Sequence, residues 1–202
     1  MKLLLATANL HKLLELKAML KGAFPKIDLY SLRDFKDYKS PDELANSFEE
    51  NAELKALSAA KHFNMLCLAD DSGLVIPSLE GRPGVKSARF AGENATDKEN
   101  ILKLLEEMKD LDGDKRNGHY TCTLALANPS KIIKTVSADC EGRITESLKG
   151  AAGFGYDPIF IKHDYNATFG ELTAEIKCRI SHRRKAMDKI IPTLESYLHC
   201  TI

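Results

Sequence analysis

Met65-Leu66-Cys67-Leu68-Ala69-Asp70-Asp71-Ser72-Gly73 is the stretch of sequence from which we predict the fold and the site. Its first five residues are apolar and predict a buried β-strand, and the polar residues after them predict the end of that strand. Two adjacent carboxylates there are costly unless they contact a cation, a hydrogen-bond donor or water. Mg²⁺ takes oxygen ligands and is often held by one or two carboxylates. We therefore expect one aspartate to bind metal or orient an attacking water, in preference to a simple Asx-turn.

A helix is predicted immediately upstream of this strand. Ser47 and Glu50 have the spacing of a capping box, so the helix should begin there. Glu50, Asn51 and Lys55 can share one side of the helix by the i, i+4 rule. A solvated helix face has the same pattern, and the acidic pair Asp42-Glu43 is equally ambiguous by itself.

The N-terminus predicts a strand, a turn and a second helix. An apolar run over residues 2–7 is followed by a helical pattern that should stop at Gly22. The turn, Thr7-Ala8-Asn9-Leu10-His11-Lys12, presents free backbone N–H groups and a lysine, which is the chemistry of an anion site. The alternative is that Thr7 and Asn9 only cap the helix and that Lys12 is solvated. The sequence is not a Walker A loop, because GxxxxGK[ST] is absent.

The rest of the chain completes a mixed α/β pattern. Thr96 and Glu99 form a second capping box, and residues 119–127 and 131–138 predict a hairpin. Ser181 should cap a last helix, in which Pro192 predicts a kink or a boundary. Helices alternate with strands early and strands pair late, so we expect an α/β fold with a mixed central sheet flanked by helices. We expect one domain over residues 1–202, with two lobes.

A glycine-rich loop and a basic helix start form the remaining polar cluster. The loop is Gly153-Phe154-Gly155-Tyr156-Asp157-Pro158, and the helix start is Ser181-His182-Arg183-Arg184. Phe154 or Tyr156 could stack on a purine, while Asp157 accepts hydrogen bonds. His182 and Arg183 are donors suited to a carbonyl or phosphate oxygen. The alternative is a tight turn with a core phenylalanine, followed by a helix start with exposed cations.

Composition limits the partners and the compartment. Lysine plus arginine and aspartate plus glutamate number 29 each, which argues against a nucleic-acid partner and leaves a small anion open. The N-terminal apolar run is too short for a signal peptide, and no window approaches a membrane span. We therefore expect a cytoplasmic protein with no membrane partner. Five scattered cysteines without a CxxC pair predict free thiols at Cys67, Cys122, Cys140, Cys178 and Cys200.

Six segments together resemble the inosine triphosphate pyrophosphatase family, which acts on non-canonical purine nucleoside triphosphates. They occur in the family's order and cover nearly the whole chain, and DDSGL, RPGVKSARFAG and GFGYDPIF are long and specific. The matching segments are LATANLHK, SFEENAELKA, LADDSGL, GRPGVKSARFAG, GFGYDPIF and ELTAEIKCRISHRRKA.

The resemblance implies a fold and a reaction. It implies an elongated molecule of two lobes, with the active site in the cleft between them, and a homodimer. It also implies a magnesium-dependent hydrolase that removes ITP, dITP and XTP from the nucleotide pool, cleaving the α–β phosphoanhydride to release pyrophosphate.

The resemblance also assigns roles to individual residues. Asp71 would be the catalytic general base, and Asp42 and Asp71 would bind Mg²⁺. The turn at residues 7–12, with Lys55 and Lys177, would surround the triphosphate, and the glycine-rich loop with His182 and Arg183 would hold the base. The residues expected to bind substrate are Thr7, Ala8, Asn9, Leu10, His11, Lys12, Lys55, Ser72, Phe154, Gly155, Tyr156, Asp157, Lys177, His182 and Arg183.

Two other functions remain as alternatives. A Maf-like pyrophosphatase has a similar opening but prefers pyrimidine or modified nucleotides, and GFGYDPIF and SHR favour the first family. A nucleotide-binding protein that does not hydrolyse is disfavoured by the intact Asp71 and Lys55. Three positions depart from the family's usual pattern, and they bear on phosphate contact and not on the reaction: Ala8, Ile176 and Cys178.

Overall fold

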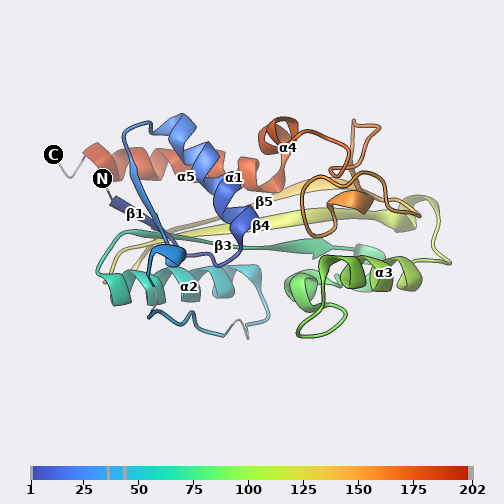
Figure 1. Cartoon of the computed structure of the whole chain (residues 1–202), viewed down its shortest axis with the longest axis horizontal. Coiled ribbons are helices and arrows are strands. Elements are labelled where there is room, and N and C mark those ends of the chain that lie inside the picture. The colour runs from blue at the N-terminus through green and yellow to red at the C-terminus, as the bar shows by residue number, and fades with distance from the viewer. Residues whose placement is uncertain (1, 36, 43–44, 200–202) are drawn as a thin grey trace. The chain divides into compact units, whose positions relative to one another are not determined.

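The computed structural model describes residues 2–35, 37–42 and 45–199, and its centre is a six-stranded sheet (Figure 1). The strands lie in the order β2-β1-β3-β4-β5-β6. β1 pairs in parallel with both β2 and β3, whereas β5 and β6 are antiparallel, so the sheet is mixed. The strand bounds are β1 Lys2–Leu5, β2 Asp28–Ser31, β3 Cys67–Val75, β4 Asn117–Ala127, β5 Ile132–Ile144 and β6 Phe160–Lys162.

Helices flank the sheet, and the predicted α/β class is confirmed. The α-helices are α1 Leu10–Ala23, α2 Phe48–Phe63, α3 Asp97–Glu107, α4 Ala174–Ile180 and α5 His182–His199. Short 3₁₀ helices cover Leu32–Asp34, Pro77–Leu79, Gly84–Arg89, Gly113–Arg116 and Asp157–Ile159. Within the described residues, no helix combines the length and apolar character that a bilayer span requires.

The chain divides into two compact units, and the first is built from three segments. These are Met1–Asp71, Cys122–Ala138 and Arg183–Ile202. In this unit α1 and α5 cover one face of the sheet and α2 covers the other (Figure 1). The buried side of α2 carries four alanines that pack on small residues of the strands, among them Ala69 and Ala125, and it also buries Asn51 and Lys55. Only this one side of the helix can be buried, because its other positions are largely polar.

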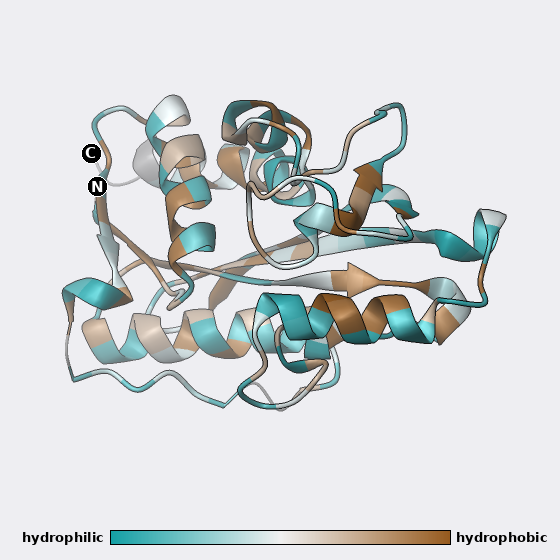
Figure 2. Ribbon diagram, turned by 45° about the vertical axis from the view of Figure 1, so that its right-hand side comes forward, coloured by the Kyte–Doolittle hydropathy of each residue, from teal (hydrophilic) through white to brown (hydrophobic). Residues whose placement is uncertain are grey.

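The second unit comprises Ser72–Thr121 and Asp139–His182. Its α3 presents an apolar side, with Ile101 and Leu104 buried in the core beside Met108, the residue that follows the helix. Hydrophobic and hydrophilic residues alternate along this helix, so that one side remains polar (Figure 2). Aromatic rings fill the core beside it, and the ring of Tyr120 meets that of Phe160 edge-on, 4.7 Å between centroids.

Several local predictions are confirmed. Thr96 and Glu99 exchange both hydrogen bonds of a capping box at the start of α3, and Ser47 accepts from the Glu50 N–H at the start of α2. β4 and β5 form the predicted hairpin, closed by the Asn128 N–H donating to the Lys131 carbonyl at 3.0 Å.

Two element ends differ from the prediction, and one helix was not predicted. β3 does not end before the aspartates but runs through them to Val75, because partners from distant segments satisfy its polar side chains. α1 continues one residue past Gly22, to Ala23. α5 continues through Pro192, where a kink or a boundary was predicted, so Pro192 is not a helix boundary. The seven-residue helix α4 was not predicted, and Ser181 lies at its C-terminal end as well as before α5.

Candidate active site

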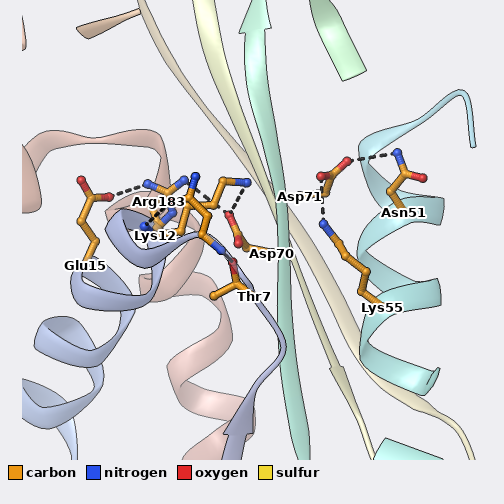
Figure 3. A network of polar contacts seen from close by, with 9 residues as sticks. Thr7, Lys12, Glu15, Asn51, Lys55, Asp70, Asp71 and Arg183 are labelled. Atoms are coloured by element: carbon orange, nitrogen blue, oxygen red, sulfur yellow. Dashed lines mark hydrogen bonds and ion pairs between the residues drawn. The ribbon is translucent and has the colours of Figure 1, made fainter. Parts of the chain in front are cut away.

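Asp70 and Asp71 send their carboxylates to opposite faces of the sheet (Figure 3). Side chains alternate along a strand, so two consecutive residues within β3 must diverge. Asp70 points toward α1 and α5, and Asp71 points toward α2 (Figure 3). The sequence presents the two aspartates as one acidic pair, but the strand separates them into two sites with different partners.

Asp71 is held by two donors from α2. The Lys55 ammonium lies 3.0 Å from Asp71 Oδ1, and the Asn51 amide donates to Oδ2 at 3.2 Å. Asn51 and Lys55 are one helical turn apart, which brings both donors to the same side of the helix. Each carboxylate oxygen therefore has a donor of its own, and the carboxyl plane has a defined orientation. Asp71 is 5% exposed, whereas the neighbouring Ser72 is half-buried.

Asp70 is the buried centre of an ionic network. Its Oδ2 lies 3.2 Å from the Lys12 ammonium and 3.4 Å from the Arg183 guanidinium, and Arg183 also pairs with Glu15. Burial alone would raise the pKa of Asp70, but Lys12 and Arg183 outweigh it and lower the pKa well below its usual range. Burial opposes the charge of Arg183 too, yet Asp70 and Glu15 raise its pKa above the ordinary value.

The turn before α1 caps the helix and leaves its tip accessible. Asn9 accepts from the Lys12 N–H at 3.1 Å, and the Asn9 N–H donates to the Thr7 hydroxyl at 3.3 Å. The residues from Ala8 to His11 are exposed. Lys12 is not the solvated cation of the alternative interpretation, because its ammonium pairs with Asp70. An anion at this helix start would meet free N–H groups and a lysine that is already positioned.

The glycine-rich loop of the second unit is organised by Asp157. The Asp157 carboxylate accepts from the Phe154 N–H at 2.9 Å and pairs with the Lys177 ammonium at 2.5 Å. The same ammonium lies 4.3 Å from the centre of the Phe154 ring, in cation–π contact. The turn requires glycine at residue 153, where φ is +78° and a Cβ would lie 2.0 Å from Asp157 Oδ2.

Two further contacts fix this loop. The Gly155 N–H donates to Asp97 at 2.7 Å, and the Tyr156 hydroxyl donates to the Ser87 carbonyl at 2.9 Å. Tyr156 is buried, whereas Phe154 is half-buried. Of the two rings predicted to stack on a purine, Phe154 is therefore the one that remains accessible.

The predicted site residues fall into two groups. The first unit holds the turn at residues 7–12 with Asp42, Lys55, Asp71 and Arg183, and the second unit holds Ser72, the glycine-rich loop, Lys177 and His182. His182 stacks on Tyr120, with 4.6 Å between ring centroids. Arg183 pairs with Asp70 and Glu15.

Several residues that contact the site residues could not be assigned a role from the sequence. Asn51 was grouped with Lys55 on one side of a helix, and its contact with Asp71 could not be seen without the fold. Glu15 follows Lys12 by three residues, which is a helical spacing, but an exposed pair would have the same pattern. Ser87 lies within the matching segment GRPGVKSARFAG but is not singled out by it, and Asp97 and Tyr120 lie outside the matching segments.

The residues that could hold a metal are few. Within the described residues, no three His, Cys, Asp or Glu side chains come together closely enough to hold an ion by themselves. Asp42 is exposed, and Asp71 offers carboxylate oxygens beside a lysine and an amide. Mg²⁺ is commonly bound through one or two carboxylates plus substrate phosphates, so these oxygen donors fit that ion if a phosphorylated ligand completes the shell.

Comparison with known proteins gives matches over almost the whole chain. The sequence model of the Ham1 family matches residues 3–193. The chain is 49% identical over 197 residues to the dITP/XTP pyrophosphatase of Protochlamydia amoebophila, covering 97% of this chain and 98% of that protein. It is 45% identical over 199 residues to the dITP/XTP pyrophosphatase of Chlamydia trachomatis serovar L2, covering 98% and 95%.

Solved structures give the same result. The Staphylococcus aureus Ham1 protein superposes with a TM-score of 0.86 at 35% identity, covering 98% of this chain and 100% of that one. A Mycobacterium abscessus protein described as a nucleoside-triphosphatase or dITP/XTP pyrophosphatase superposes with a TM-score of 0.77 at 38% identity, covering 95% and 100%. The similarity therefore extends over the entire fold and is not confined to one motif.

Proposed function

The chain belongs to the Ham1 family, and from this premise we propose that it hydrolyses non-canonical purine nucleoside triphosphates to monophosphates and pyrophosphate. It is a nucleoside triphosphate pyrophosphatase, and its substrates are ITP, dITP and XTP. The observation that carries the proposal is the near-full-length identity with dITP/XTP pyrophosphatases. The buried, oriented carboxylate of Asp71 supplies the group that such a hydrolysis requires.

We assign the chemical step to Asp71. A carboxylate held at both oxygens can accept a proton from water in one fixed direction, which is the geometry that general-base catalysis needs. The water would attack the α-phosphorus, and the pyrophosphate would leave. The Lys55 ammonium, 3.0 Å from Asp71 Oδ1, holds one oxygen of this carboxylate in place.

We assign the phosphates to the start of α1 and to the nearby lysines. The exposed turn offers N–H groups, and Lys12 and Lys55 offer charge. Asp42 and Asp71 are the residues that would hold Mg²⁺, which when bound offsets phosphate charge. Ser72 is assigned to the substrate as well, because it follows Asp71 in β3 and is half-buried.

We assign the base to the glycine-rich loop. The half-buried Phe154 ring would stack on the purine, while Asp157 and His182 would bind its polar edge. Lys177, predicted to contact the triphosphate, instead bonds Asp157 and lies over Phe154, which favours a place in the base-binding group. Arg183 already pairs with Glu15 and Asp70, so contact with the 6-oxo group would add to these ion pairs or replace one of them. Donors aimed at a 6-oxo group would be left unpaired by the 6-amino group of adenine.

We further propose that the enzyme acts as a homodimer in the cytoplasm, without a nucleic-acid or membrane partner. The balanced charge supports the last point, since 29 basic and 29 acidic side chains leave no general attraction for polyanions. Light scattering tests the dimer directly. A mass near 22.4 kDa at micromolar concentration would contradict it.

The deciding experiment is a substrate panel. Pyrophosphate release should be measured with and without Mg²⁺ on ITP, XTP, dITP, ATP, GTP, dUTP and a modified pyrimidine triphosphate. We expect magnesium-dependent release from the first three and little from the rest. A preference for pyrimidines would assign the chain a Maf-like activity, and no release from any nucleotide would indicate binding without hydrolysis.

A further inference from the structure

Asn51 is a buried neutral side chain that contacts the proposed catalytic carboxylate of Asp71. It lies in the first turns of α2 and is 1% exposed. Its amide N–H donates to Asp71 Oδ2 at 3.2 Å and to the Ala45 carbonyl at 3.5 Å, while its oxygen accepts from the Ala45 N–H at 3.2 Å. A buried amide must satisfy its polar groups, and these three bonds do so.

The orientation of this amide is determined by chemistry. If the amide were turned over, its oxygen would face the Asp71 carboxylate and its nitrogen would face the Ala45 N–H, so that both contacts would become repulsive. The backbone of Ala45 therefore holds the Asn51 nitrogen toward Asp71. The Lys55 ammonium binds Asp71 Oδ1, and the Asn51 amide fixes the direction of Asp71 Oδ2.

The second end of Asn51 reaches the segment that carries a proposed metal ligand. Ala45 lies three residues after Asp42 and two before the helix cap Ser47. The side chain of Asn51 thus connects Asp71 to the chain that leads to Asp42.

A second asparagine in the chain has the same local structure without the carboxylate contact. Asn100 lies four residues after the cap Thr96, as Asn51 lies four residues after Ser47, and it is 2% exposed. Its oxygen accepts from the Ala91 N–H at 2.8 Å, and its nitrogen donates to the Ala88 carbonyl at 3.1 Å. Asn100 therefore ties preceding backbone to a helix start, as Asn51 does, but has no acidic partner among these contacts.

We propose that Asn51 is a positioning residue of the hydrolase, which fixes the carboxylate plane of Asp71 and ties it to the backbone of Ala45. This inference rests on the proposed function. Asn51 contacts neither substrate nor metal in this role. Its contribution is the direction of the Asp71 oxygens, and misdirection of a reacting group by about 1 Å can cost on the order of 10²-fold in rate.

The matched pair Asn51→Leu and Asn100→Leu tests this proposal. Both changes replace a buried amide at the same helix position with an apolar side chain of similar size, so both should lower the melting temperature. At a temperature where both variants are folded by circular dichroism, Asn51→Leu should lower kcat for ITP on the order of 10²-fold while changing KM less than about threefold. Asn100→Leu should keep kcat within about threefold of the parent.

Two additional measurements separate positioning from folding. Asn51→Gln keeps the amide and should recover part of the lost kcat relative to Asn51→Leu. Hydrogen exchange should speed up at Ala45 in Asn51→Leu and at Ala91 in Asn100→Leu, which shows that each substitution released its own backbone contact.

The outcomes are distinguishable from failure of the proposed function. If the parent releases no pyrophosphate from any nucleotide, the function itself is wrong. If the parent is active and Asn51→Leu matches it in kcat, or if Asn100→Leu loses as much kcat as Asn51→Leu, the positioning role is overturned. A loss in Asn51→Leu that Asn51→Gln does not reduce at all would also overturn it.

Discussion

Asp70 and Asp71 are consecutive acids in one strand, yet their carboxylates have different partners. Asp70 is enclosed by Lys12 and Arg183, and Arg183 is itself balanced by Glu15. Asp71 receives one cation and one neutral amide, both from α2. The network around Asp70 neutralises charge, which stabilises the folded chain. The contacts of Asp71 fix direction, and a fixed but less neutralised carboxylate is what a general base requires.

The largest expected effect is on the Asp71 side. Asp71→Asn removes the proton acceptor while keeping the shape, and general-base catalysis typically contributes about 10²–10⁴-fold. We expect turnover of ITP to fall by on the order of 10³-fold, with nucleotide binding largely retained. Pyrophosphate release and equilibrium binding of ITP measure the two properties separately. Near-normal kcat would remove Asp71 from the role.

The same substitution on the Asp70 side should affect stability more than chemistry. Asp70→Asn leaves the buried Arg183 and the half-buried Lys12 short of an anion, and breaking a buried pair costs about 3 kcal/mol. For a chain of this size, that corresponds to a fall in melting temperature of about 10 °C. Urea unfolding of Asp70→Asn and Asp71→Asn side by side measures the contrast. Equal stability of the two variants would contradict the distinction between the two faces.

In the parent, the contribution of the Asp70 network to stability should be lost at low pH. The folded-state pKa of Asp70 is lowered, so its stabilisation is complete above the unfolded pKa of about 3.9 and is lost as pH falls through the region below it. One such group adds a slope of up to about 1.4 kcal/mol per pH unit there. The free energy of unfolding should therefore fall less steeply below about pH 4 in Asp70→Asn than in the parent. Parallel curves would show that Asp70 does not contribute.

The smallest expected effect is on a thiol beside the Asp70 network. Burial raises the pKa of Cys122 to about 12, so the native thiol should not react with Ellman's reagent at pH 8. Asp70→Asn should open the first unit more often, and labelling of Cys122 should then be faster. Peptide mass spectrometry identifies the labelled cysteine. Rapid labelling of Cys122 in the folded parent would contradict its burial.

Much of the fold could be predicted from local signals. The capping residues Ser47 and Thr96 mark where α2 and α3 begin, because a cap acts within four residues of itself. The hairpin at Asn128 is predicted for the same reason, since its turn is short. The length of β3 could not be predicted, because the polar residues at its centre are satisfied by partners up to 113 positions away, as with Asp70 and Arg183.

The candidate residues of the site could be predicted from the sequence, but the contacts between them could not. The sequence and the resemblance identify Asp71, Lys55 and the glycine-rich loop as candidates, and the proposed function keeps them. The pairing of Arg183 with Asp70 and Glu15 was not predicted, because a helix start rich in cations looks the same whether it is buried or exposed. The contact of Asn51 with Asp71 also depends on where α2 packs, which no local pattern shows.

Because β3 runs through both aspartates, insertions and deletions in this strand have a different effect from substitutions. Successive side chains of a strand face opposite ways, so inserting or deleting one residue between Met65 and Asp70 would exchange the faces of everything that follows. Asp70 would then face α2, and Asp71 would face Lys12 and Arg183. A substitution in this strand alters one face of the sheet, whereas a single-codon insertion or deletion would disrupt the charge network and the catalytic group together.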